Sequence, residues 1–547
     1  MQKRRASTIP PPSWKEQGYI PARYAVSFLA FLGMVFNYML RVNINFAIVA
    51  MVKPSANESD SGGGTALEVC GFNDTSHHDD EEGEFEWDEF TQSLITGAFF
   101  WGYIWTQIPG GRLAEVMGAK RVFGGALTLA CVMTCLVPVA AHAGYGVLIA
   151  VRVLLGISEG ATFPSTHALL ASWAPPLERS TLSTIIYAAQ RAAEIMFYML
   201  HEKLFPFGLE ALDYVTAGIT MVWVILWFLL MSDKPEDFRW IKKVEVDYIN
   251  QALGDSKYKK APPVPWRAAL TSVPFWAILV AGVGNNWGFY TLLTDLPLYM
   301  KNMLGQDLKS TAWKSGLPYL GMWIVSLLVS SIGDNMQKRG YITTTVLRKV
   351  ANTIAHVGPA ICMVCLSFVE CDTAATFALL FASVSLMGGI YTGFMVNHID
   401  IAPNYAGTLF GITNAAATIP GWLAPMTVGA LTNGNQTFGQ WRKVFYISAA
   451  IFTVDALFYI IFGTGTEQEW NKIASPKLKG DEPDSGHREA EGPSKGTEAA
   501  SLGTWSQIAR EAVAGADQTK YKSYDDYVSN PNFRRSGSHA NPAFQED

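Results

Sequence analysis

Twelve long apolar runs, separated by short polar stretches, limit what this sequence can fold into. A helix that spans a bilayer needs about 20 mostly apolar residues. The runs lie approximately at 24–52, 91–111, 121–141, 146–171, 183–204 and 212–232, and then at 273–299, 313–333, 349–369, 374–396, 405–431 and 443–463. Only 16% of the residues are charged, whereas soluble proteins average about 25%. The pattern predicts an all-α membrane protein with twelve transmembrane helices in two six-helix halves.

The polar stretches divide the chain into five predicted segments. They are a cytoplasmic N-terminal segment (1–23), a first half (24–232), a cytoplasmic central bridge (233–272), a second half (273–463) and a tail (464–547). The tail is rich in Gly, Ser, Glu and Lys and has too few apolar residues to bury a core, so we expect a disordered cytoplasmic tail. The first apolar run is too long for a signal peptide, so no cleavable signal is expected.

The basic residues of the bridges predict which side of the membrane is cytoplasmic. If twelve helices alternate, one side collects Lys3, Arg4, Arg5, Lys15, Arg23, Arg112, Lys120, Arg121, Lys242, Lys243, Lys259, Lys260, Lys338, Arg339, Arg348 and Lys349. The loop 53–90 falls on the other side and holds a dozen Asp and Glu against one Lys. It carries glycosylation sequons at Asn57 and Asn73, and a third sequon at Asn435 also falls outside. We therefore predict an extracytoplasmic, glycosylated loop 53–90 and cytoplasmic termini.

The six cysteines do not form a disulfide framework. Four of them (Cys131, Cys135, Cys362 and Cys365) lie inside apolar runs, where a small buried side chain is the expected role. Cys70 and Cys371 fall in predicted outside loops, where oxidation is chemically accessible. The sequence does not determine whether these two pair.

Composition and motifs also argue against several classes of function. The formal net charge of −6 gives no sign of nucleic-acid binding. There is no P-loop, so transport driven directly by ATP is not expected. Neither a nucleophile with an oriented base nor a metal-ligand cluster stands out. We therefore expect no enzyme activity, no cofactor and no metal.

The bridge between the second and third runs carries a pattern of glycines, an acid and two bases. Gly111, Glu115 and Gly118 are followed by Lys120 and Arg121. Glycines allow a tight turn and a close approach of helices. The acid can pair with a base across a sliding helix interface. We predict a gating role for these five residues; the alternative is a basic turn with no such role.

Three ionisable residues fall inside apolar runs of the first half. Such residues are expensive in a membrane and indicate a functional site. Arg41 can hold an anion through several charge-assisted hydrogen bonds. Arg152 and Glu159 are seven residues apart, which places both on one helix face. Glu159 could carry a coupling proton, or Arg152 could form a static ion pair with Glu159 or with another acid.

Several motifs together resemble solute carrier family seventeen, the anion transporters of the major facilitator superfamily. They are Leu40-Arg41-Val42-Asn43, Phe99-Phe100-Trp101-Gly102-Tyr103, Gln107-Ile108-Pro109-Gly110-Gly111, the run from Arg152 to Pro164, Trp287-Gly288-Phe289-Tyr290-Thr291-Leu292-Leu293-Thr294, and the string from Asn397 to Thr408. In the last string the signature residues are Asn397, His398, Asp400, Pro403 and Gly407. The resemblance covers roughly residues 24–470 and is strongest toward sialin and the type I sodium-phosphate cotransporters.

The resemblance implies a site and a mechanism. It implies gradient-driven or potential-driven transport of an organic anion or phosphate. Arg41, Arg152, Asn285 and Tyr290 would bind the substrate, and Glu159 would couple it to an ion. His398 and Asp400 could be read as an acid–base or metal pair, but a loop that caps helix ends is the favoured reading.

Departures from the family pattern narrow the substrate. Glutamate carriers have a histidine where this chain has Thr96 and an arginine where it has Asn285, so vesicular glutamate transport is disfavoured. Some relatives have a histidine where Gly282 stands. In the fifth run, Arg191 and Glu194 replace the usual glycine- and proline-bearing segment and could neutralise each other. Whether that pair lines the pathway or joins helices stays open.

We therefore predict a secondary carrier that works by alternating access between two six-helix halves. The expected partners are a small anion and the lipid bilayer, with Na⁺ or H⁺ as coupling ion and a monomeric state. Two alternatives remain: a transporter-shaped receptor or scaffold, and an uncoupled anion uniporter or channel. Substrate identity, coupling ion and plasma or vesicle membrane are not determined by the sequence.

Overall fold

A computed structural model gives the structure of this chain. It describes residues 11–13, 16, 20–51, 85–87, 89–187, 193, 209–253, 263–302, 308–432 and 437–472. The chain divides into two units, Met1–Pro476 and Lys477–Asp547, of which the second lies outside the described residues. The sequons at Asn57, Asn73 and Asn435, together with Cys70, Arg191 and Glu194, also lie outside them.

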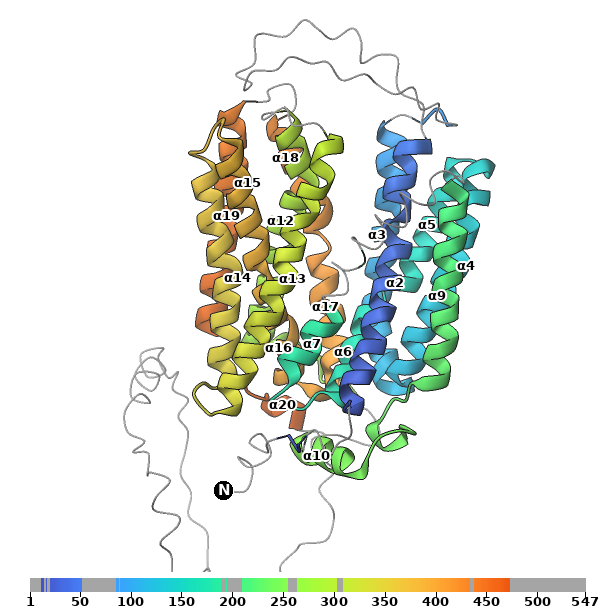
Figure 1. The fold of residues 1–547 in the computed structure, drawn as a ribbon, viewed down its shortest axis with the longest axis vertical. Coiled ribbons are helices and arrows are strands. Elements are labelled where there is room, and N and C mark those ends of the chain that lie inside the picture. The colour runs from blue at the N-terminus through green and yellow to red at the C-terminus, as the bar shows by residue number, and fades with distance from the viewer. Residues whose placement is uncertain are drawn as a thin grey trace, which may run out of the picture. The chain divides into compact units, whose positions relative to one another are not determined.

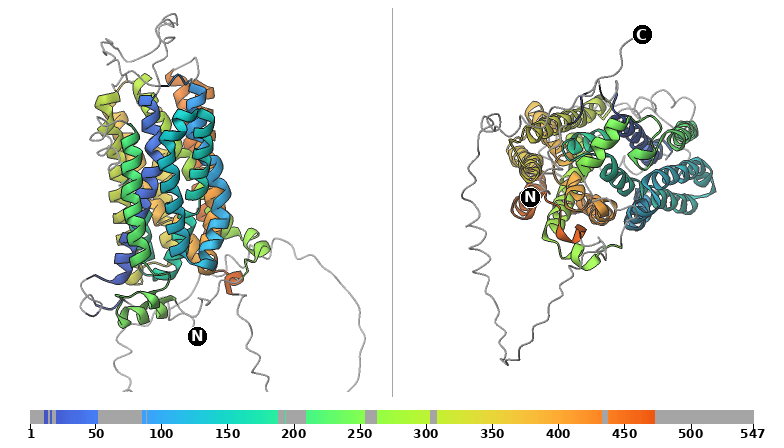
Figure 2. Two further views of the ribbon diagram at one scale, coloured as in Figure 1. Left: turned by 90° about the vertical axis from the view of Figure 1, so that its right-hand side faces the viewer. Right: turned by 90° about the horizontal axis from the view of Figure 1, so that it is seen from below.

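The first half is built from helices that run along one bundle (Figure 1). They are α2 (Ala22–Met51), α3 (Glu89–Met117), α4 (Ala119–Ala143), α5 (Tyr145–Glu159), α6 (Thr162–Trp173), α7 (Arg179–Tyr187) and α9 (Leu209–Leu230). Three short helices follow in the central bridge: η5 (Pro235–Asp237), α10 (Lys243–Leu253) and α11 (Trp266–Leu270). The bridge, expected only to be a polar connection, thus contains ordered helices at one end of the bundle (Figure 2), here called the α10 end.

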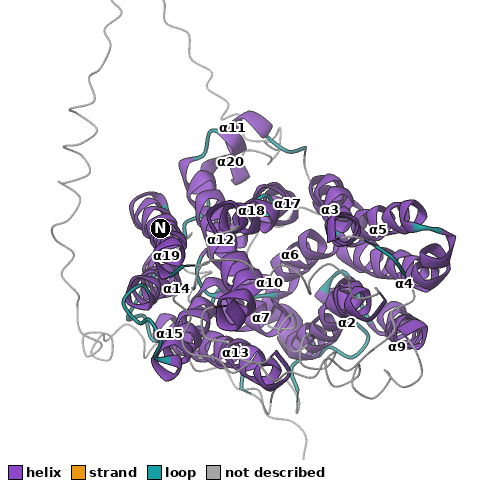
Figure 3. Ribbon diagram, turned by 90° about the horizontal axis from the view of Figure 1, so that it is seen from above, coloured by secondary structure: helices purple, strands orange, loops and turns teal. Residues whose placement is uncertain are grey.

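The second half repeats this layout beside the first, as the view from above shows (Figure 3). Its helices are α12 (Val273–Asn302), α13 (Leu308–Lys338), α14 (Thr344–Leu366), α15 (Thr373–Leu386), η7 (Met387–Tyr391), α16 (Phe394–Ile401), η8 (Pro403–Tyr405), α17 (Ala406–Ala417), α18 (Pro420–Thr432), α19 (Phe438–Phe462) and α20 (Glu469–Lys472). Helices α3 and α6 of the first half pack on α17, and α7 packs on α13.

Eight helical segments in the described part of the chain are long and apolar enough to cross a membrane. They are Ala22–Ile44, Ala119–Ala143, Tyr145–Trp173, Glu210–Leu230, Leu317–Lys338, Thr344–Leu366, Thr373–Ile401 and Phe438–Phe462. The other predicted runs coincide with α3, α7, α12 and the pair α17–α18. Helices therefore form at all twelve predicted runs, although the fifth is described only in part.

Interrupted helices bring backbone and polar side chains to the centre of the bundle. The fourth predicted run is split between α5 and α6 at Gly160 and Ala161, and the eleventh is split before Pro420. Proline lacks the amide hydrogen that a continuing helix needs, which accounts for the second break. At this break the carbonyl of Ala417 accepts a hydrogen bond from Asn286 Nδ2 at 2.6 Å instead.

Glycines set the close packing of α3 on α5, which fixes the position of the predicted site. A Cβ on Gly102 would lie 2.0 Å from the carbonyl oxygen of Val153, and one on Gly156 would lie 2.0 Å from that of Phe99. Small residues at such interfaces let helix backbones approach closely in a membrane. The approach holds Phe99 and its neighbours on α3 at a fixed distance from α5.

The first residues of the predicted disordered tail are ordered. Residues 464–472 follow α19 and lie at the α10 end of the bundle. There the amide of Gln468 donates to the carbonyl of Ile401 at 2.9 Å. Trp470 on α20 is 8% exposed and its ring stacks on Tyr405 at 6.1 Å. The described contacts of the membrane unit therefore extend past residue 464, because Trp470, an apolar residue in an otherwise polar stretch, packs on Tyr405 of η8.

Each described cysteine is free or disulfide-bonded according to whether it lies in a membrane span or in a predicted outside loop. Cys131, Cys135, Cys362 and Cys365 are free thiols on membrane-spanning helices. Cys371, in the short connection between α14 and α15, is disulfide-bonded.

Candidate functional site

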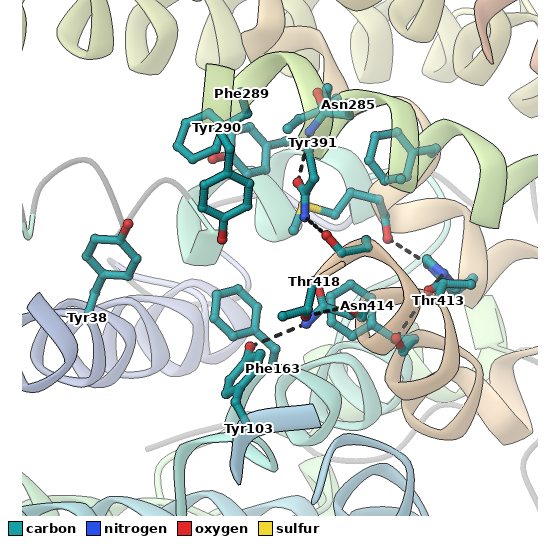
Figure 4. Close-up of a pocket in the computed structure, with 18 of the residues that line it drawn as sticks. Tyr38, Tyr103, Phe163, Asn285, Phe289, Tyr290, Tyr391, Thr413, Asn414 and Thr418 are labelled. Atoms are coloured by element: carbon teal, nitrogen blue, oxygen red, sulfur yellow. Dashed lines mark hydrogen bonds between the residues drawn. The ribbon is translucent and has the colours of Figure 1, made fainter. Parts of the chain in front are cut away.

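A cavity lies between the two halves, lined by side chains from both. Its walls come from α2, α3 and α6 of the first half and from α12, α13, η7, α16, α17 and the residue after it in the second. Tyr38, Tyr103 and Tyr290 approach this space from three different helices (Figure 4). The cavity contains three of the four predicted substrate-binding residues, Arg41, Asn285 and Tyr290, together with His398 of the signature string.

Arg41 is held on aromatic rings rather than by an acid. Its guanidinium carbon lies 4.6 Å from the ring centroid of Phe99, 5.0 Å from Phe100, 4.9 Å from Tyr103 and 5.8 Å from Tyr38. Cation–π contacts of this kind stabilise a charge without neutralising it. No hydrogen bond or ion pair joins Arg41 to any residue in the described ranges. Its N–H donors therefore stay available to a bound anion.

Arg152 and Glu159 do not line this cavity. Both are buried, Arg152 at 2% exposure and Glu159 at 0%. No ion pair joins these two residues in the described structure, where Arg152 Nε and Glu159 Oε1 are both without a partner. Seven residues span about 10 Å along a helix axis, so a shared face does not bring the two charged groups together.

Each member of this pair has other neighbours. Arg152 lies over the ring of Phe99 at 5.4 Å, the same ring that supports Arg41. Glu159 Oε2 accepts a hydrogen bond from Asn37 Nδ2 at 3.3 Å, while Glu159 Oε1 and Arg152 Nε have no hydrogen-bond partner. A buried carboxylate oxygen without a donor suits an acid that carries a proton in part of a cycle.

An acid that the sequence reasoning missed lies close by. Asp213 on α9 is 5% exposed, and its Oδ1 accepts from Asn43 Nδ2 at 3.0 Å. The same amide group of Asn43 donates to Thr216 Oγ1 at 2.8 Å. Asp213 stands at the second position of a predicted run, where an acid looks like the edge of a span. The rule for ionisable residues inside spans would have found it if applied to the ends.

The opposite wall of the cavity supplies neutral polar groups. Asn414 Nδ2 donates to Gln107 Oε1 at 2.7 Å and to Tyr103 Oη at 3.3 Å, which ties α17 to α3 across the cavity. Asn285 Nδ2 donates to Asn286 Oδ1 at 3.4 Å. This wall therefore offers amides and hydroxyls to a ligand. Its described lining residues include no Lys or Arg, and His398 is its one histidine.

Two of the five predicted gate residues, Gly111 and Glu115, lie where the halves meet at the α10 end. A Cβ on Gly111 would lie 2.2 Å from the carbonyl oxygen of Gly407, so the two backbones are in direct contact. Glu115 Oε1 accepts from the amide of Thr408 at 2.7 Å, and Oε2 accepts from its hydroxyl at 2.7 Å. The expected base across the interface is absent from this contact. Glu115 pairs instead with Arg112 on its own helix at 3.1 Å and caps α17 of the other half.

The turn after α3 is formed as its glycine predicts. Gly118 has a φ of +103°, which favours glycine. The following amide, of Lys120, donates to Asp233 Oδ1 at 2.7 Å. Arg121 is exposed. These residues shape the end of the bundle and do not reach the cavity.

Asp400 is the centre of a buried ion network rather than part of a capping loop. It lies on α16, where Oδ1 accepts from Arg179 Nη1 at 2.8 Å and Oδ2 from Arg348 Nε at 2.6 Å. Arg348 also donates to Ser180 Oγ at 2.6 Å. The network therefore joins α7 of the first half to α14 and α16 of the second. Asp400 lies at the end of α16, as expected, but its carboxylate binds two arginines.

The remaining signature residues have separate roles in the same region. His398 lines the cavity and its Nε2 is 2.7 Å from Thr413 Oγ1. Asn397 Nδ2 donates to Tyr459 Oη at 2.7 Å. Pro403 begins η8, and Gly407 is the backbone contact of Gly111. The described residues hold no group of three or more metal-ligating side chains, so His398 and Asp400 do not form part of such a cluster.

A second layer of contacts closes the α10 end. Arg23 Nε donates to Glu178 at 2.7 Å and its Nη1 to Glu245 of α10 at 2.8 Å. Lys338 of the second half reaches Glu178 at 3.3 Å. Glu245 also accepts from the amide of Ala22 at 2.8 Å, which caps α2. The central bridge thus adds a helix to the closed end of the transport unit.

Comparison with known proteins agrees with this architecture. The model of the Major Facilitator Superfamily matches residues 30–425. Human sialin is 40% identical over 450 residues, covering 82% of this chain and 90% of sialin. A Drosophila melanogaster protein provisionally named as an inorganic phosphate cotransporter is 40% identical over 468 residues, covering 84% of this chain and 88% of its own.

A solved structure of a proton:xylose symporter, XylE, bound to 6-bromo-6-deoxy-D-glucose, shares the fold with a TM-score of 0.58 at 14% identity. The match covers 83% of this chain and 98% of that one. These relatives are transporters rather than enzymes, and the predicted twelve-helix fold in two halves is confirmed. The chain therefore belongs to the major facilitator superfamily, within solute carrier family seventeen, and is a multi-pass secondary active transporter.

Proposed function

We propose that this transporter moves a small organic anion through the cavity between its halves, with Arg41 as the anion-binding group. The main support is that Arg41 has no acidic partner in the described structure. Its guanidinium rests on aromatic rings, faces the cavity and has no acid bound to it in the described structure. A fixed cation of this kind in a membrane needs a mobile counter-ion, and a substrate anion supplies one.

The cavity composition favours an organic anion over inorganic phosphate. Among the described lining residues Arg41 is the permanent cation, while Tyr290, Tyr391 and Phe289 contribute broad ring surfaces. Phosphate carries up to two charges and usually takes several charged donors. A monovalent carboxylate with a hydroxylated or apolar body uses one arginine, the amides and the rings together. Sialin, by its name, fits this class, and the phosphate cotransporter name gives the second candidate.

Sidedness follows from the basic residues and the closed end. Lys243 lies on α10, Lys338 bonds to Glu178 at the same end, and Lys120 begins α4 there. The positive-inside rule makes this end cytoplasmic. Contacts such as Gly111 to Gly407 would then close the cytoplasmic side, which supports assigning the structure to the outward-facing part of the cycle. Breaking them while the outer ends approach would complete alternating access.

In this mechanism Glu159 carries the coupling proton in the first half. Glu159 is buried and does not line the cavity, and its Oε1 has no hydrogen-bond partner. Sodium is the alternative coupling ion. The transporter is expected to act as a monomer, in either the plasma membrane or a vesicle membrane.

Transport in proteoliposomes tests the proposal. The full chain is reconstituted and given radiolabelled monocarboxylates, acidic sugars, acidic amino acids, urate and phosphate, with pH, sodium and voltage gradients imposed separately. We expect accumulation of a monovalent organic anion driven by a proton gradient. Preferential accumulation of phosphate would favour the second candidate. Binding without net movement would instead support a receptor, and movement that follows voltage alone would support a uniporter.

A further inference from the structure

Two titratable side chains meet inside the second half, away from the arginine site. Asp455 on α19 is 2% exposed and His356 on α14 is 0% exposed. Asp455 Oδ2 and His356 Nε2 are 3.8 Å apart. Neither Asp455 oxygen nor His356 Nε2 has a hydrogen-bond partner of good geometry, although the backbone of Ala281 on α12 lies near the His356 ring and the amide of Ala456 lies near the Asp455 carboxyl. Three unsatisfied polar atoms in one buried place require an explanation.

The histidine presents an acceptor to the acid. Its Nδ1 lies 2.8 Å from the carbonyl oxygen of Asn352, and since a carbonyl only accepts, Nδ1 carries the hydrogen. In the neutral ring Nε2 is then unprotonated. A protonated Asp455 could donate to it after a movement of about 1 Å, because a hydrogen bond between such atoms is about 2.8 Å long.

No other charged side chain of the described residues pairs with the Asp455 carboxyl group. Helix α12 presents Gly284, and an added Cβ there would lie 1.8 Å from Asp455 Oδ2. Along its described side chains, α12 carries no Lys, Arg, His, Asp or Glu. On α14, Arg348 lies two turns toward the α10 end and is bonded to Asp400 of α16.

The other neighbours are neutral. Phe394 of α16 and Phe452 of α19 pack on the His356 ring at 6.0 and 5.7 Å. Tyr459, one turn beyond Asp455, accepts from Asn397 and is titratable only at high pH. An isolated carboxylate in such surroundings is strongly disfavoured. The pair must therefore hold a proton, either on Asp455 or as a histidinium–carboxylate pair.

Residues that pack on this pair belong to the same helices that line the cavity. Gly284 is followed directly by Asn285 and Asn286, which line it, and Phe394 lines it from α16. Because Gly284 of α12 packs on Asp455 and Phe394 of α16 packs on the His356 ring, a shift of either helix would change the surroundings of the pair. We propose that His356 and Asp455 form a proton-binding site in the second half, separate from Glu159. This His356–Asp455 site takes up and releases one proton as α12 moves.

The exchange involves one proton and no other reactant. In the occupied form the proton lies on Asp455 Oδ or on His356 Nε2, and the pair is neutral overall. On release, the proton passes to water that enters from the cavity, and the pair is left with one negative charge. That charge is tolerated only while water is present, so release belongs to a state in which α12 has opened the site.

Infrared difference spectroscopy of the full chain in lipid tests this inference without any substrate. Spectra are taken across pH in sodium-free buffer. We expect carboxylic-acid C=O absorption that grows on acidification, with one component that is lost in Asp455→Asn and kept in Glu159→Gln. The matched control is Glu370→Gln, an exposed acid paired with Arg442, which should leave the band unchanged. His356→Gln keeps the acid and should shift both the band's frequency and its pH midpoint.

Several outcomes would overturn the inference. A band that belongs to Asp455 but persists at every pH would mean a permanently protonated, static acid. Loss of the band on adding sodium at constant pH would identify a cation site instead. If Asp455→Asn fails to fold, His356→Gln still decides, because an unchanged band and midpoint would separate the histidine from the acid. None of these readouts depends on anion transport, so they stand apart from failure of the proposed function.

Discussion

The guanidinium carbon of Arg41 lies 4.6 Å from the ring centroid of Phe99. The contact holds the cation at the cavity wall without placing an acid beside it. A carboxylate partner would have competed with any incoming anion for the same donors. A ring offers orientation and partial stabilisation while leaving the charge in place. The site is thus organised for an anion before one arrives.

Removing this cation should abolish anion binding. For Arg41→Ala we expect uptake to fall to background with the protein still in the membrane, and substrate affinity to fall about 100-fold, equivalent to roughly 3 kcal/mol. Arg41→Lys should restore little, since an ammonium lacks the planar fork of donors. Uptake and equilibrium binding in proteoliposomes give both quantities.

The control for Arg41 is Arg339→Ala, which removes an exposed arginine at the α10 end. It should transport normally. Wild-type affinity in Arg41→Ala, measured beside this control, would remove Arg41 from the binding site.

A methyl group at Gly111 should keep the α10 end from closing. The new carbon would lie 2.2 Å from the carbonyl oxygen of Gly407, a distance that two packed atoms cannot hold. The population should therefore shift toward forms open at that end. Spin labels at exposed Arg121 and Arg339, one on each half, should report longer distances in Gly111→Ala. Gly125→Ala on α4 has open space around the added carbon and should match the parent; equal distances in both variants would contradict the prediction.

Loss of the Asp400 carboxylate should destabilise the closed form strongly. Asp400→Asn leaves Arg179 and Arg348 without their acid, and both are buried. Removing one member of a buried ion network costs about 3–5 kcal/mol. We expect a clear fall in the melting temperature in detergent. Glu370→Gln breaks an exposed pair with Arg442 and should cost only about 0–1 kcal/mol. Similar melting temperatures for the two variants would show that the Asp400 network contributes little to stability.

Local pattern was sufficient for the helices and for individual residues, but not for their partners. Apolar run length predicted the spans, and the glycine at position 118 predicted the turn that its φ of +103° shows. The contact of Glu115 with Thr408 joins residues from opposite halves, so no spacing along the chain reveals it. The pair Asp455 and His356 is likewise not visible from spacing, because the two residues lie about a hundred positions apart on different helices of the second half. Each is visible as an ionisable residue in a span, but only the packing of α14 on α19 makes them a pair.

The last prediction concerns Glu159, whose carboxyl group has a single described partner in Asn37 and one unsatisfied oxygen. Glu159→Gln imitates the protonated acid with nearly the same shape. If Glu159 carries the coupling proton, this variant remains in a permanently protonated form. It should exchange labelled for unlabelled anion in counterflow at close to the parent rate, while accumulation driven by a pH gradient falls to the equilibrium level. Asn37→Asp would place a second acid beside the first and should raise the pH at which accumulation begins to fail, because two adjacent carboxylates share one proton. Counterflow and pH-driven uptake measured on the same vesicles separate the two activities. Full accumulation by Glu159→Gln would show that the coupling proton binds elsewhere, and loss of counterflow together with accumulation would make Glu159 part of the anion site or of its support.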